Sequence, residues 1–450
     1  MPDFSQPLEQ YLSRKPSWLR EVASQGVHST HEHLHTEAQR LARGPDTALW
    51  LHHYLPTDLA GAGVSPEVLQ QMVQERDRPP YIPLRELDAS IINAFSLVRH
   101  TGYGEVVKRT ASLFGGSGEL TVENLASCIA GLEQRLTPGF YARECGRCGL
   151  LSMQTNSFDM VDGERLPVRR EQCHSFHFKD LFIDGFLRWP HAEMAQQEKS
   201  LRVDSLESWE ALVERYFADD AADCIAVKCA MAYARSLNFE AVEREDASRA
   251  LDAMLAPASA TGSTASERRA FENYGMRFIL ALAGRYELPV KFHTGHYAGH
   301  GSEPLHRIRN NLIDLEPLIA AFPQVNFIIM HHAYPYGEAA VTLAKSYANC
   351  FIDQCWTWAM NPAAASRYLF EFLLGAPANK LFLFGGDYAC LELTLGHLDL
   401  ARQGLCLTLE RLVDEGWATP DEALELARRV CHRNQEALFP PLRHLKQASP

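Results

Sequence analysis

The sequence predicts an α/β protein with the architecture of a (β/α)8 TIM barrel, and two observations support this fold class. Short apolar runs recur from about residue 149 to residue 384, and stretches of helical pattern lie between them. Candidate metal ligands directly follow three of these runs: His293, His331 and Asp387. Parallel strands that alternate with helices bring their carboxyl ends to one face of a barrel, where active sites lie.

The first predicted strand begins at Val27 and ends in a histidine cluster. His31 and His33 are two residues apart, and residues two apart on an extended strand point to the same side. Both imidazoles can therefore reach one ion.

Seven further strands are expected at intervals along the chain. They are placed at residues 149–155, 181–187, 224–231, 289–293, 325–331, 349–354 and 381–384. Their nearly continuous apolar character suits strands that a parallel sheet buries on both faces. Helices are expected at residues 205–217, 240–256, 264–286, 312–322, 337–347, 363–374, 391–403, 408–416 and 420–438.

The segment 36–148 is too long for one crossover and carries several helical patterns. We interpret the chain as a single barrel over residues 1–450, in which 36–148 is a helical insertion after the first strand. Thr121 is the expected N-cap of one of its helices. We expect the insertion to cover the barrel mouth, where such segments close a site and contact the substrate.

Composition excludes several function classes. The net charge is −13 and no basic run is present, which argues against nucleic acid as a partner. No apolar run approaches the length of about 18 residues that a membrane span needs. The N-terminus shows no signal pattern, and the 11 cysteines fit a reducing compartment, so a cytoplasmic location is expected.

The ligand types at the strand ends predict a metal centre. Neutral imidazole and carboxylate suit Zn, Mn or Fe. Taken alone, His293 and His331 could each be an ordinary polar turn residue, and Asp387 could cap the following helix. Together with the pair His31 and His33, they favour a metal.

The chain resembles the amidohydrolase superfamily, in the branch called amidohydrolase family two, to which uronate isomerases are related. The segments that carry the resemblance are Thr30-His-Glu-His-Leu, His293-Thr-Gly, the run from Phe322 to Tyr336, Lys380-Leu-Phe-Leu-Phe-Gly-Gly-Asp-Tyr and the terminal stretch from Arg433 to Phe439. The resemblance implies a distorted barrel in which His31, His33, His293 and Asp387 surround a divalent metal. It also implies one or two ions, zinc being the first choice, and a homo-oligomer.

The resemblance leaves the roles of two residues open. His331 is either a ligand to a second metal or a catalytic residue. Lys228, late in the fourth strand, is either a carbamylated bridge between two metals, a charge-paired site lysine, or a lysine facing the surface or a lid. The sequence also departs from the usual pattern, since Gly386 replaces a more common serine before Asp387 and His332 replaces a glycine after His331.

Candidate substrate contacts follow predicted strand ends. Tyr233 and Arg235 could hold an anionic or polyhydroxy substrate, and Arg188 also lies near a strand end. Trp356 could form a wall of the pocket, although ordinary loop packing explains it equally well.

The resemblance favours a metal-dependent hydrolase that acts on a small, anionic molecule. Asp387 would move a proton from the attacking water to the leaving group. The alternatives are a sugar-acid isomerase or a decarboxylase on the same ligands, and a barrel that binds a metal or ligand without catalysis.

Overall fold

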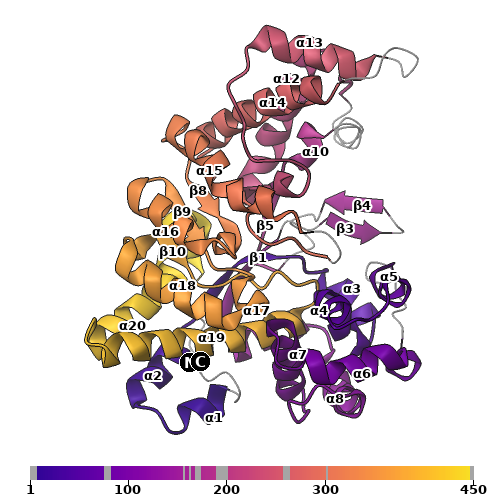
Figure 1. Cartoon of the computed structure of the whole chain (residues 1–450), viewed down its shortest axis with the longest axis vertical. Coiled ribbons are helices and arrows are strands. Elements are labelled where there is room, and N and C mark those ends of the chain that lie inside the picture. Colours follow the sequence, from indigo (N-terminus) through magenta and orange to yellow (C-terminus); the bar gives the residue numbers. More distant parts are fainter. Residues whose placement is uncertain are drawn as a thin grey trace. The chain divides into compact units, whose positions relative to one another are not determined.

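The computed structural model describes residues 8–74, 83–155, 158–161, 164–167, 174–188, 201–256, 264–299 and 303–445 (Figure 1). Eight strands form one sheet in the order β1-β2-β5-β6-β7-β8-β9-β10, which follows the order of the chain. The pair β1–β2 and the successive pairs from β5 to β9 are parallel. Strands β3 and β4 form a separate antiparallel hairpin. The predicted (β/α)8 barrel is thereby confirmed.

The strands are short, as parallel barrel strands usually are. They are β1 (Val27–Glu32), β2 (Leu150–Thr155), β3 (Phe158–Val161), β4 (Glu164–Pro167), β5 (His177–Phe182), β6 (Cys224–Cys229), β7 (Val290–Phe292), β8 (Phe327–Ile329), β9 (Cys350–Asp353) and β10 (Leu381–Phe382). Every residue of β1 and of β6 is buried, which fits a sheet covered on both faces.

The helices that precede β2 are α1 (Leu8–Leu12), α2 (Ser17–Ala23), α3 (Glu37–Ala42), α4 (Leu55–Gly61), α5 (Pro66–Gln74), α6 (Ala89–Val98), α7 (Gly102–Leu113), α8 (Val122–Arg135) and α9 (Phe140–Arg147). The later helices are α10 (Asp184–Leu187), α12 (Leu206–Asp220), α13 (Arg244–Leu255), α14 (Ala265–Arg285), α15 (Leu305–Ala321), α16 (Gly337–Ser346), α17 (Thr357–Met360), α18 (Pro362–Gly375), α19 (Leu391–Asp414), α20 (Pro420–Arg428) and α21 (Asn434–Leu438).

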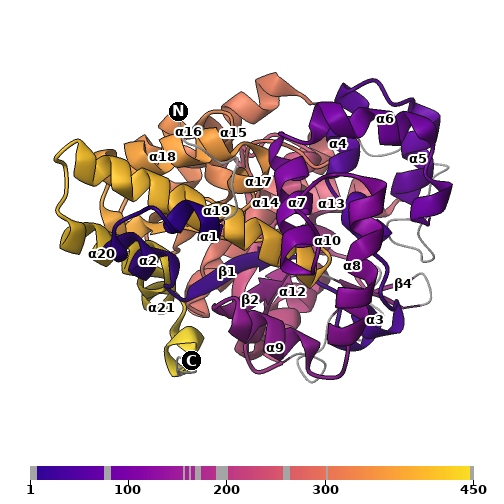
Figure 2. The ribbon, with the colours of Figure 1, turned by 90° about the horizontal axis from the view of Figure 1, so that it is seen from below.

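The first compact unit comprises Met1–Phe178, His296–Glu303 and Asp353–Pro450. Within it, α2, α7 and α18 pack against α19 (Figure 2). The described residues of the predicted insertion, 36–74 and 83–148, form α3 to α9 with short 3-10 turns and contain no strand. Thr121 accepts a hydrogen bond from the Asn124 amide at 3.1 Å, which confirms it as the N-cap of α8.

The second compact unit comprises Lys179–Gly295 and Pro304–Ile352. Helices α12, α13 and α14 pack against one another in it (Figure 1). Two of them begin with a capping box, in which Ser205 opens α12 and Thr264 opens α14. In each box the cap and the third helical residue satisfy each other's free amide, and this fixes the point where the helix begins.

The structure differs from the prediction at the third strand and in the C-terminal region. The third strand was expected at residues 181–187, but β5 ends at Phe182 and the apolar residues Phe186 and Leu187 are buried by the short helix α10 instead. The C-terminal region was expected to hold separate helices at residues 391–403 and 408–416. Here α19 runs without a break through Gly404, where a Cβ would strike the Trp358 ring. This glycine is required by packing and does not end the helix.

In the described part of the chain, no helix combines the length and the apolar composition that crossing a bilayer would require.

Candidate metal centre

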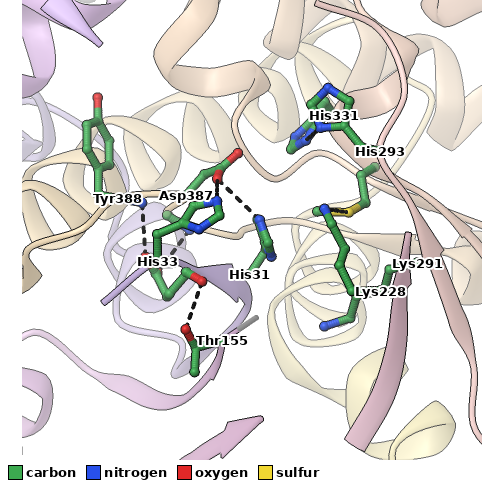
Figure 3. A network of polar contacts seen from close by, with 12 residues as sticks. His31, His33, Thr155, Lys228, Lys291, His293, His331, Asp387 and Tyr388 are labelled. Carbon is green, nitrogen blue, oxygen red and sulfur yellow. Dashed lines mark hydrogen bonds and ion pairs between the residues drawn. The ribbon is translucent and has the colours of Figure 1, made fainter. Parts of the chain in front are cut away.

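His31, His33 and Asp387 meet in the first unit. His31 lies in β1, His33 directly follows it, and Asp387 follows β10. The Nε2 atoms of His31 and His33 lie 3.2 Å and 3.0 Å from the same atom, Asp387 Oδ1 (Figure 3). His31 and Asp387 are 1% and 3% exposed, whereas the His33 side chain is 40% exposed. One side of this three-residue cluster is therefore open to solvent.

The donor atoms of this cluster fit a divalent metal. The ligand atoms of His31, His33 and Asp387 all lie within 4.8 Å of one another. Nitrogen and oxygen ligands at about 2.1 Å from one ion are about 3.0 Å apart at octahedral angles and about 3.4 Å apart at tetrahedral angles. The observed separations of 3.0 Å and 3.2 Å agree with these values.

Backbone hydrogen bonds hold the two segments of this cluster together. The Asp387 amide donates to the carbonyl of His31, and the His33 amide donates to the carbonyl of Tyr388, each at 3.0 Å. Asp387 has φ +61°, in the left-handed region that residues other than glycine seldom adopt. The strand end and the Asp387 turn are therefore one hydrogen-bonded assembly.

Glu32, between the two histidines, is fully buried and faces this turn. Its Oε1 accepts from the Gly386 amide at 3.0 Å and from Ser29 Oγ at 2.7 Å. Its Oε2 accepts from the Tyr388 amide at 3.3 Å and from Thr394 Oγ1 at 2.9 Å. Burial raises the pKa of Glu32, whereas the hydrogen bonds from Ser29, Thr394 and the Tyr388 amide act in the opposite direction.

His293 and His331 meet in the second unit. His331 Nε2 lies 3.0 Å from His293 Nδ1, and both rings are buried (Figure 3). One of these two nitrogens carries the proton of the hydrogen bond. The strand was expected to run to His331, but β8 ends at Ile329, and His331, His332 and Ala333 all have positive φ. Buried His332 has its pKa lowered to about 3 by desolvation.

Lys228 lies in β6 and is 2% exposed, which contradicts the surface-facing alternative. Its Nζ lies 2.8 Å from the sulfur of Met330 (Figure 3). The parallel register places Lys228 beside Lys291 of β7, whose Nζ donates to both carboxylate oxygens of Asp180 at 2.8 Å and 2.9 Å. Its role as a carbamate bridge or as a charge-paired site lysine stays a prediction.

The predicted ligands come from both compact units. His31, His33 and Asp387 belong to the first unit, and His293 and His331 belong to the second. Their convergence on one metal centre stays a prediction.

The candidate substrate contacts of the second unit differ in their exposure to solvent and in the residues that they contact. Tyr233 is 39% exposed, and its ring centroid lies 4.4 Å from that of His293. Arg235 is 8% exposed, and its guanidinium donates to Glu272 at 2.7 Å and to Asn273 at 2.6 Å. Arg188 is exposed at the end of α10. Tyr233 is therefore the one with an exposed side chain next to a candidate ligand.

Trp356, in the first unit, is 1% exposed and belongs to an aromatic cluster. Its ring stacks on Tyr54 with centroids 4.3 Å apart, and Tyr54 in turn stacks on His53 at 4.1 Å. The His53 ring lies 6.5 Å from that of His33. The segment 36–148 therefore brings aromatic residues close to the candidate ligands, which the sequence analysis did not identify. The adjacent rings of His52, His53 and Tyr54 are visible in the sequence as a cluster, but nothing in that cluster indicates the contact with Trp356.

Among solved structures, the fold is similar to two uronate isomerases. The one from Thermotoga maritima has a TM-score of 0.71 at 14% identity and covers 94% of this chain and 96% of its own. The one from Caulobacter crescentus has a TM-score of 0.71 at 14% identity and covers 100% of this chain and 98% of its own. A candidate metal-dependent hydrolase from Lactobacillus casei has a TM-score of 0.65 at 14% identity, with coverages of 99% and 100%.

Among curated proteins, the chain is 25% identical over 244 residues to Protein fluG of Emericella nidulans, which covers 52% of this chain. The chain spans about a quarter of the length of that relative, 27%. The family model described as Amidohydrolase (Amidohydro_2) matches residues 193–440, which is more than half of the chain. This match includes His293, His331 and Asp387, and the chain therefore belongs to the amidohydrolase family.

Proposed function

We propose that this chain is a metal-dependent hydrolase in which water attacks a C–N or C–O bond of a small, anionic substrate. The observation that carries the proposal is the approach of His31 Nε2 and His33 Nε2 to a single oxygen of Asp387, at 3.2 Å and 3.0 Å, in a member of the amidohydrolase family.

The site residues have separate roles in metal binding, proton transfer and polarisation of the scissile bond. His31, His33 and Asp387 hold the ion, with His293 as a further ligand, and zinc is the first choice before manganese or iron. When bound, a divalent ion lowers the pKa of a coordinated water to about 7. Asp387 accepts the proton of the attacking water and returns it to the leaving group. His331 either holds a second ion or polarises the scissile bond.

The substrate contacts belong to the same proposal. Tyr233, beside His293, donates a hydrogen bond from its hydroxyl to the substrate, and Trp356 supports the aromatic cluster of the first unit. Arg235 and Arg188 supply positive charge to an anion, although Arg235 already pairs with Glu272.

A second candidate is a sugar-acid isomerase on the same ligands. The likeness to two uronate isomerases over almost the whole chain supports it at the level of the fold. A third candidate is a decarboxylase that uses the same ligands. Turnover in water labelled with oxygen-18 separates them, because hydrolysis places one labelled oxygen in the product. Isomerisation needs no such incorporation, and decarboxylation releases carbon dioxide.

The first experiment is elemental mass spectrometry of protein purified without a chelator. We expect at least one metal per chain in the parent and a clear loss in His31→Ala and Asp387→Ala. His100→Ala, whose side chain is 68% exposed, is the matched control that keeps the metal. A parent protein that holds no metal, even after dialysis against zinc, manganese or iron, would overturn the proposal.

Lys228→Ala extends the same measurement. Two metals in the parent that fall to one or fewer in the variant mean that Lys228 bridges them, and the substrate screen then begins with amides, lactones and phosphoesters. One metal that the substitution leaves unchanged assigns Lys228 to the substrate, and sugar acids and carboxylated aromatics then come first.

A further inference from the structure

We propose that Glu32 is the positioning residue of the candidate metal centre: its two carboxylate oxygens clamp the amides on both sides of Asp387 and hold that ligand against His31 and His33. This inference rests on the proposed metal site and adds a residue that binds neither metal nor substrate.

The geometry of the clamp is specific. Glu32 Oε1 accepts from the amide of Gly386, and Oε2 accepts from the amide of Tyr388, at 3.0 Å and 3.3 Å. These are the residues immediately before and after Asp387. The third amide of the turn, that of Asp387, donates to the carbonyl of His31 at 3.0 Å. All three amides of the turn are therefore bonded to residues 31 and 32 of β1.

The clamp stabilises a backbone conformation of Asp387 that is unfavourable by itself. Asp387 has φ +61°, and residues other than glycine occupy the left-handed region only when the surroundings impose it. The two hydrogen bonds that the flanking amides donate to Glu32 restrain this conformation. They also fix the direction in which the Asp387 carboxylate leaves the turn.

Gly386 shows how closely the turn approaches Glu32. A Cβ at position 386 would collide with both carboxylate oxygens of Glu32. Glycine is therefore needed here because of the close approach, and Glu32 and Gly386 form a matched pair. Ser29 and Thr394 complete the arrangement, since the hydroxyl of each donates a hydrogen bond to one oxygen of Glu32, at 2.7 Å and 2.9 Å.

Replacing Glu32 by Gln tests the clamp with a change of almost no volume. Gln has one oxygen and one NH2 group, so a donor must now face either the Gly386 amide or the Tyr388 amide. The binding constant for zinc is measured by competition with a chromophoric chelator, and hydrogen exchange is followed in a peptide that covers residues 384–389. We expect a roughly 10–100-fold loss of zinc affinity and faster amide exchange in that peptide.

Two further variants separate positioning from a general loss of stability. Thr394→Val removes one of the four donors to Glu32 and keeps both amide bonds, so we expect a smaller loss of zinc affinity. Glu392→Gln alters another fully buried carboxylate of the same unit, one that pairs with Arg40, and should lower the melting temperature while leaving zinc affinity unchanged.

The outcomes distinguish this inference from the proposed function. Parent affinity and parent exchange in Glu32→Gln would overturn the clamp, and so would an equal loss of zinc affinity in Glu392→Gln. If the parent binds no metal, the proposed function fails, while exchange in residues 384–389 still tests the clamp. If Glu32→Gln does not fold, Thr394→Val decides: unchanged affinity and exchange would overturn the inference.

Discussion

Lys291 and Asp180 form an ion pair in which neither side chain is exposed to solvent. Lys291 Nζ lies 2.8 Å from Asp180 Oδ2 and 2.9 Å from Oδ1. The two residues come from β7 and β5, and β6 with Lys228 lies between these strands. Burial raises the pKa of Asp180, while the ammonium of Lys291 lowers it and is the smaller effect.

Breaking this pair on one side should destabilise the protein severely. Asp180→Leu and Lys291→Met each leave a buried charge without its partner, at an expected cost of about 3–5 kcal/mol. The double variant Asp180→Leu/Lys291→Met removes both charges and should cost less than either single change. Urea unfolding followed by circular dichroism measures all three, and a double variant as unstable as the sum of the singles would contradict the argument. Asp219→Asn is the control, because its pair with Arg215 is largely exposed and contributes less than about 1 kcal/mol.

Asp387→Asn should separate metal binding from proton transfer. The amide keeps an oxygen that can face His31 and His33, so we expect the fold and most of the metal to remain. Asn cannot accept the proton of the attacking water, and turnover of any substrate found by screening should therefore disappear. Elemental analysis and kcat are measured on the same sample, with Asp421→Asn, an exposed change in the first turn of α20, as the control. Activity retained in metal-loaded Asp387→Asn would exclude the assigned role.

The parts of the fold that were predictable are those governed by local periodicity. His31 and His33 could be paired from their spacing of two at the end of an extended strand, and the structure brings both to Asp387. The position of Asp387 after the last strand could also be predicted, because a short apolar run precedes it. Barrel topology then explains why residues more than 350 positions apart lie together.

The parts that were not predictable depend on tertiary contacts. Glu32 was overlooked because two of its partners are backbone amides, which every residue except proline possesses and which leave no mark in the sequence. The stack of Tyr54 on Trp356 joins segments about 300 residues apart with no spacing rule between them. The third strand was misplaced because apolar residues such as Phe186 can be buried equally well by a short helix.

The stability of the protein should fall as the pH is lowered through the range of His52. This residue is fully buried in the segment 36–148, and its Nδ1 lies 3.2 Å from the carbonyl of Met72. Desolvation lowers the pKa of His52 from its ordinary value of 6.5 to about 4. Between these two values the unfolded chain binds a proton that the folded chain does not, so this stabilisation is complete above pH 6.5 and is lost as the pH falls toward 4. His52→Gln keeps a donor for Met72 and cannot titrate, so its stability should fall less steeply over this range, by up to about 1.4 kcal/mol per pH unit. Melting temperatures of both proteins at pH 7.5, 6.5, 5.5 and 4.5 measure the difference, and parallel profiles would show that His52 does not contribute.

Buried His332 and His397, with pKa values lowered to about 3 and about 4, remain in both proteins. Both proteins should therefore still lose stability at low pH, and only the difference between their slopes reports on His52.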